Sequence, residues 1–143
     1  MNHFFISFPR WTFSIVCLLI LIWLLAAPTP YMEFIADRIG NNDYFCHMIM
    51  GAGMAFCLFF DWQRKHQWQF LRLPQIGLMA LVASAITGLL EISQALTPEE
   101  YRRWFEVRDL LWQLAGITGI GVLYYLAQSL WSAGYSQSRF SDL

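Results

Sequence analysis

The stretch DYFCHMIMGAGMAFCLFF, residues 43–60, decides the fold class. It is apolar except at its beginning, where Asp43 and His47 stand one helical turn apart. A helix needs about 20 predominantly apolar residues to cross a bilayer, and this stretch approaches that length. A charged group near mid-bilayer costs roughly 2.5–3.5 kcal/mol, so a membrane helix that begins with such groups needs partners for them or a use for them.

Three further apolar runs fill much of the remaining chain, at 11–27, 75–96 and 110–131. Together with 44–60 they predict an all-α polytopic membrane protein. The expected architecture is four transmembrane helices in a compact bundle, which is a single membrane domain over 1–143. The segment 132–143 is polar, and we expect it to be a disordered tail.

Composition supports this class and excludes others. The chain is 57% hydrophobic and 13% charged, whereas a soluble domain carries about 25% charged residues. A net charge of −1 gives no basic surface for nucleic acid. Cys17, Cys46 and Cys57 are an odd number without CxxC spacing, so we expect free thiols and neither a disulfide framework nor a cysteine zinc site.

Orientation follows from the Lys and Arg residues near the helix ends. Four helices put both termini and the loop 61–73 on one side, which carries five of the nine basic residues. The other four lie among acidic residues that can pair with them. We therefore expect a multi-pass protein of the bacterial cytoplasmic (inner) membrane with both termini in the cytoplasm. A cleaved signal peptide is the alternative for 11–27, although no A-x-A site follows it.

This topology gathers the polar residues of the apolar runs at the outer face. The start of the second helix, the end of the third and the start of the fourth all lie there. Small residues lie one turn deeper, as Gly51 does below His47 and Gly116 below Gln113, and they allow close helix approach. The candidate ligand-binding residues of this outer face are Asp43, His47, Glu91, Gln94, Arg103, Asp109 and Gln113.

Three of these residues are also candidates for catalysis. His47 could act as a base or acid oriented by Asp43, or it could be an ordinary hydrogen-bonding residue near the interface. Glu91 could mark a site, because intramembrane acids often do, or it could pair with an arginine for structure. Asp109 could be a partner in the chemistry, or it could favour the start of its helix through its negative charge.

The other candidates point to binding rather than to chemistry. The planar fork of Arg103 suits a phosphate or carboxylate, although a solvated loop residue is equally consistent. Gln113 is expected to make an interhelical hydrogen bond. His47, Glu91 and Asp109 could bind a divalent ion, but no HxxxH or HExxH spacing supports one, so we expect no metal and no cofactor.

The pattern resembles the VanZ-like family of small bacterial integral membrane proteins. That family shows Asp-Lys-x-x-His beginning one helix, Glu-x-x-Gln ending another, then a loop Arg, and Asp, Asn and Gly beginning the last. The matching residues here are Asp43-Tyr44-Phe45-Cys46-His47, Glu91-Ile92-Ser93-Gln94, Arg103, Asp109, Gln113 and Gly116. The resemblance covers about 42–121, with Tyr44 in place of the family's Lys and Gln113 in place of its Asn.

The resemblance implies a four-helix protein of the cell envelope with the polar pattern near the outer face. It also implies a link to low-level resistance to the glycopeptide teicoplanin, without an established reaction. We therefore expect a binding protein for a membrane lipid or a cell-wall precursor. The alternatives are a membrane-embedded hydrolase or transferase acting on a lipid-linked substrate, and a small transporter or channel, which would have to be an oligomer.

Overall fold

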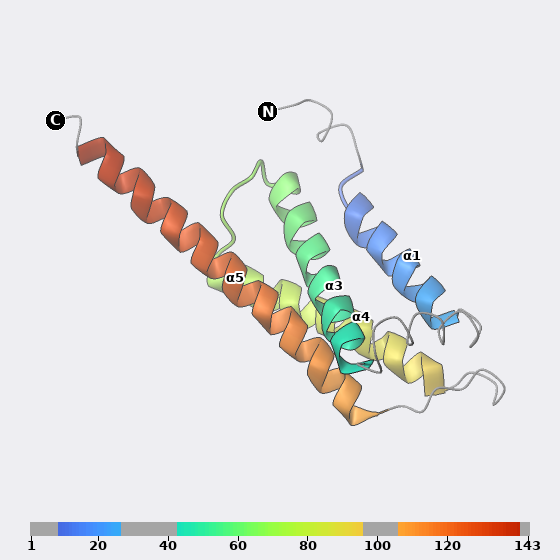
Figure 1. Ribbon diagram of the computed structural model, residues 1–143. Coiled ribbons are helices and arrows are strands. Elements are labelled where there is room, and N and C mark those ends of the chain that lie inside the picture. The colour runs from blue at the N-terminus through green and yellow to red at the C-terminus, as the bar shows by residue number, and fades with distance from the viewer. Residues whose placement is uncertain (1–8, 27–42, 96–105, 141–143) are drawn as a thin grey trace.

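The structure is a computed structural model that describes the backbone of residues 9–26, 43–95 and 106–140, and side chains over 9–24, 44–93 and 106–132 (Figure 1). Every regular element in these ranges is a helix, so the all-α class is confirmed. The helices are α1 (Thr12–Ala26), α3 (Asp43–Lys65), α4 (Leu73–Ala95) and α5 (Val107–Phe140).

Three of the helices are long and apolar enough to cross a membrane, over Tyr44–Lys65, Leu73–Ser93 and Val107–Ser132. α1 is apolar but has 15 residues, fewer than the roughly 20 that a perpendicular span needs. The long helices expose large apolar side chains such as Leu89 and Leu123, which are 67% and 63% exposed. Such surfaces suit contact with lipid, and the chain fits a multi-pass membrane protein.

Two helices are longer than the apolar runs that predicted them. α3 continues past Phe60 to Lys65, through part of the expected loop, because Asp61 is buried there with hydrogen-bond partners of its own. α5 continues past Trp131 to Phe140, where we expected a disordered tail. That segment contains no proline to stop a helix.

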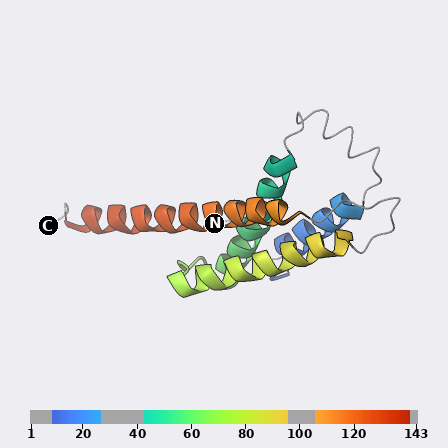
Figure 2. The ribbon, with the colours of Figure 1, turned by 90° about the horizontal axis from the view of Figure 1, so that it is seen from below.

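α3 is the central element, because it packs against α1, α4 and α5 and makes its most extensive contact with α5 (Figures 1 and 2). Two glycines bring the backbones of α3 and α5 together. A Cβ atom on Gly51 would overlap the backbone of Gln113, and one on Gly116 would overlap the backbone of Met48. The expected close approach of small residues is therefore present at this crossing.

The apolar core lies where α3, α4 and α5 meet. Met54 and Phe59 of α3, Ala83 of α4 and Ile117 of α5 are all at most 2% exposed. The ring of Phe59 lies 5.3 Å from that of Tyr124, which extends this core toward the middle of α5. Packing along this line fixes the rotation of each helix and thereby decides which polar residues face one another.

A second group of buried residues, which we call the Asp61 cluster, consists of Ser14, Asp61 and Arg64. The backbone N–H and the hydroxyl of Ser14 each donate to Asp61 Oδ2 at 2.8 Å. Arg64 Nη2 donates to Asp61 Oδ1 at 3.2 Å and also to the carbonyl of Pro9. Ser14 lies in the first turn of α1, so the carboxylate of α3 caps α1 and ties the two helices together.

Candidate functional site

The candidate site, called the polar cluster below, consists of His47, Glu91, Asp109 and Gln113. They come from α3, α4 and α5. The start of α3, the end of α4 and the start of α5 lie at one end of the molecule (Figures 1 and 2). The four residues are buried, with exposed fractions of 6%, 1%, 9% and 2% in chain order. Helices distant in sequence thus bring four polar side chains into one desolvated space.

Local sequence explains why each side chain faces this space. Asp109 lies in the first turn of α5, where the helix dipole favours a negative charge, and Gln113 follows one turn later on the same face. Glu91 lies about one turn before the end of α4 at Ala95. The glycine contact between α3 and α5 lies directly beneath, because the backbone that Gly51 touches is that of Gln113 itself.

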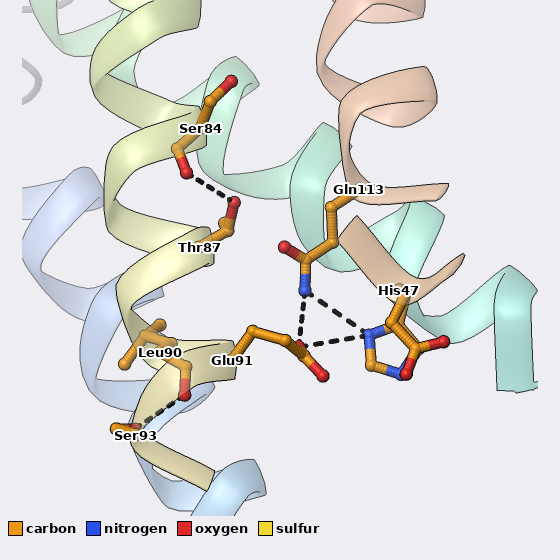
Figure 3. Close-up of polar contacts among 8 residues, drawn as sticks. His47, Ser84, Thr87, Leu90, Glu91, Ser93 and Gln113 are labelled. Carbon is orange, nitrogen blue, oxygen red and sulfur yellow. Dashed lines mark hydrogen bonds and ion pairs between the residues drawn. The ribbon is translucent and has the colours of Figure 1, made fainter. Parts of the chain in front are cut away.

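Gln113 lies at the centre of the contacts (Figure 3). Its Nε2 donates to Glu91 Oε2 at 2.9 Å and lies 3.4 Å from His47 Nδ1. The interhelical hydrogen bond expected of Gln113 is therefore present. The other end of the amide is different, since the buried Oε1 of Gln113 has no hydrogen-bond partner among the residues that the structure describes.

His47 lies between two carboxylates. Its Nδ1 is 3.6 Å from Glu91 Oε2, and its Nε2 is 3.7 Å from Asp109 Oδ2. Both distances exceed those of normal hydrogen bonds. A neutral imidazole has only one N–H to donate, so it can serve only one of these carboxylates at a time.

The polar cluster is consequently rich in acceptors and poor in donors. Glu91 and Asp109 present carboxylate oxygens, and Gln113 adds the unsatisfied amide oxygen. Buried charges are expensive unless they are paired and hydrogen-bonded. A complementary ligand would bring hydrogen-bond donors or positive charge to this space.

The structure does not describe every candidate residue. Asp43 is the first residue of α3 and Gln94 lies in the last turn of α4, but the side chains of both fall outside the described residues. Arg103 lies entirely outside them. The four candidates whose side chains are described all belong to the polar cluster.

Sequence reasoning missed two buried residues near these helices. Asp61 was assigned to a loop, yet it is fully buried and accepts hydrogen bonds from α1. Thr87 was not singled out, yet it is 2% exposed on the face of α4 that carries Glu91 one turn later. The signal available for Asp61 was its position directly after an apolar run, with Arg64 three residues on.

Three members of the polar cluster are potential metal ligands. His47, Glu91 and Asp109 each offer one ligand atom, and these atoms all lie within 4.8 Å of one another. Sequence spacing argued against a metal because motifs such as HxxxH place two ligands on one helix. The geometry instead draws one ligand from each of three helices, an arrangement that spacing within one helix cannot detect.

The chain matches no protein-family model, no curated protein and no solved structure. The VanZ-like resemblance therefore rests on the residue pattern alone.

Proposed function

We propose that this chain is a VanZ-like protein of the bacterial inner membrane with four spans and both termini in the cytoplasm. Its polar cluster then lies at the outer face and binds a lipid or cell-envelope component, without catalysing a reaction. α1 would complete the fourth span together with residues flanking Thr12–Ala26. Reporter fusions at Leu73 and at the C-terminus test this topology, since both should report the cytoplasmic side.

The observation that carries the binding proposal is the incomplete satisfaction of a buried polar cluster. Native proteins rarely leave a buried amide oxygen such as Gln113 Oε1 unsatisfied. The contacts of His47 with Gln113, Glu91 and Asp109 are 3.4–3.7 Å long, which leaves these groups poorly bonded to one another. A ligand that brings hydroxyl or amino groups would complete these bonds, and such groups occur on lipid headgroups and on lipid-linked sugars.

The direct test is native mass spectrometry of the full-length protein purified in a mild detergent. Bound lipid or lipid-linked precursor should accompany the unaltered protein and be lost from Glu91→Gln and Gln113→Leu. Ser93→Ala is the matched control, because Ser93 lies on the same helix but is exposed and donates to the carbonyl of its own helix at Leu90. Equal lipid retention by all variants would remove the proposal.

Teicoplanin susceptibility is the corresponding cellular test. A strain producing the protein should tolerate a higher teicoplanin concentration than a deletion strain, and Glu91→Gln should remove that difference. Unchanged susceptibility would separate this chain from the glycopeptide role that the resemblance implies, while leaving lipid binding to the mass-spectrometric result.

One observation favours a second candidate function, a membrane-embedded hydrolase or transferase for a lipid-linked substrate. His47 lies between Glu91 and Asp109, and a carboxylate beside an imidazole can orient it and stabilise its charged form during proton transfer. Turnover of lipid-linked phosphate substrates by purified protein, abolished in His47→Gln, would favour this reaction over simple binding.

A further inference from the structure

We propose that His47, Glu91 and Asp109 bind one divalent transition-metal ion in the polar cluster. The ion would take one ring nitrogen of His47 and one oxygen from each carboxylate. The proposal concerns the purified chain alone and does not rest on lipid binding, because ion binding can occur with or without a lipid at the outer face.

The spacing of the three groups carries the first part of the argument. Their ligand atoms lie within 4.8 Å of one another, and the closest approach of Asp109 to the ring is 3.7 Å. Bond lengths of about 2.0–2.2 Å from zinc to nitrogen and oxygen place neighbouring ligands of a tetrahedral site about 3.3 Å apart. The two carboxylates contact opposite ring nitrogens, at 3.6 Å and 3.7 Å, so side-chain rotation would have to bring both toward the nitrogen that binds the ion.

The charges of Glu91 and Asp109 are the second reason to expect an ion. Two carboxylates flank a ring that can donate only one proton when neutral. An ion of charge +2 would bring opposite charge to both Glu91 and Asp109, and buried charges are stabilised by pairing. It would also remove the conflict at His47, because one ring nitrogen could bind the ion while the other donates its proton.

Gln113 could supply a fourth ligand, although its nitrogen is the end of the amide that now faces Glu91 and His47 (Figure 3). Its side chain points into the polar cluster, it is 2% exposed, and its Oε1 lacks a hydrogen-bond partner among the described residues (Figure 3). A half-turn of the amide exchanges Oε1 and Nε2, which are similar in shape. The oxygen would then face the cluster as a neutral fourth ligand, and Glu91 would exchange its amide donor for the ion.

The donor set indicates the class of metal. Imidazole and carboxylate together suit zinc, manganese and iron, whereas Mg²⁺ and Ca²⁺ take oxygen ligands. Zn²⁺ is the most practical probe, because it binds such sites more tightly than manganese or iron and has no redox chemistry. Mg²⁺ is the matched control ion.

The experiment uses full-length protein in detergent, first stripped with a chelator and then dialysed against buffered Zn²⁺. Elemental analysis should find about one zinc per chain, and Mg²⁺ should not displace it. His47→Ala, Glu91→Gln and Asp109→Asn should each weaken zinc binding by at least about 100-fold, the upper end of the cost of losing an outer-shell partner. Ser93→Ala should retain full binding.

Two further measurements keep the result interpretable. Co²⁺ in place of Zn²⁺ should give visible d–d bands without a thiolate charge-transfer band, which separates this site from adventitious binding at Cys17, Cys46 or Cys57. Circular dichroism and size-exclusion profiles should match across variants, and Asp109→Asn decides the case if a more deeply buried variant fails to fold. Less than about a tenth of an equivalent of zinc, a thiolate band, or equal binding by Asp109→Asn would overturn the proposal.

Discussion

Two buried polar groups lie near opposite ends of α3, and they differ in how well their hydrogen bonds are made. In the Asp61 cluster, Ser14 donates twice to one carboxylate oxygen at 2.8 Å and Arg64 serves the other at 3.2 Å. In the polar cluster, Gln113 donates to Glu91 at 2.9 Å, the contacts of His47 with Gln113, Glu91 and Asp109 are 3.4–3.7 Å long, and Gln113 Oε1 has no hydrogen-bond partner among the described residues. Burial is similar in both, so burial alone does not distinguish them.

The completeness of the hydrogen bonds distinguishes a buried polar group with a structural role from one that binds a ligand. A fully satisfied buried network makes one arrangement rigid, and this is what a helix anchor requires. A partly satisfied network destabilises the isolated protein, so it persists in a native chain most readily where a ligand completes it. The Asp61 cluster fits the first description, and the polar cluster fits the second.

Asp61→Ala should have the largest effect on stability. It leaves the buried Ser14 N–H without its acceptor and removes the carboxylate that pairs with Arg64, and removing one partner of a buried pair costs about 3–5 kcal/mol. Reversible unfolding in mixed micelles should show this fall in the free energy of unfolding. Zinc should still bind to the folded fraction, because the polar cluster is at the other end of α3. A stability close to that of the unaltered protein would end the distinction between the clusters.

Gly116→Ala should have the next largest effect and should act on the polar cluster. Its Cβ would overlap the backbone of Met48, so α3 and α5 must separate. Overpacking of this kind costs about 1–3 kcal/mol and should also weaken ligand or zinc binding. Gly119→Ala is the control, because nothing described lies within 4 Å of its Cβ and alanine favours the helix. Equal behaviour of the two variants in unfolding and binding would contradict the close approach.

The double substitution Glu91→Leu and Gln113→Leu should have the smallest effect on stability, and the opposite sign. It removes a buried charge and an unsatisfied amide oxygen, and His47 can then donate to Asp109 alone. Replacing buried ionic groups by apolar residues is often neutral or stabilising, so we expect the free energy of unfolding to rise by about 1 kcal/mol while binding is lost. A marked loss of stability in the same unfolding assay would mean that the polar cluster is an anchor like Asp61.

The sequence was sufficient to predict features that follow from apolar runs, from the alternation of helices and from the placement of small residues. Long apolar runs predicted α3, α4 and α5, and the alternation of helices predicted that His47, Glu91 and Asp109 gather at one face, while the structure adds that their ligand atoms lie within 4.8 Å of one another. Close approach of two helices was predicted at Gly51 and at Gly116, and it is confirmed for both. Gly88, which lies about one turn before Glu91 on α4, makes no such close approach, because a Cβ there would meet only the Leu110 side chain at an ordinary 3.8 Å.

Other contacts between helices could not be predicted from the sequence. Asp61 follows an apolar run and is expected to begin a loop, since the Ser14 groups that donate to it reach it only when α1 packs on α3. The extension of α5 beyond Trp131 was missed because polarity was read as disorder. The potential metal ligands were discounted because their spacing in sequence says nothing about ligands contributed by three separate helices.

The cap on α1 has a consequence for the order of assembly. Ser14 is synthesised well before Asp61, so the first turn of α1 emerges from the ribosome while its capping carboxylate does not yet exist. During that interval water or lipid headgroups must satisfy the Ser14 N–H. The docking of α1 onto α3 is therefore a late event in biogenesis, completed only after a whole second hydrophobic segment has been made.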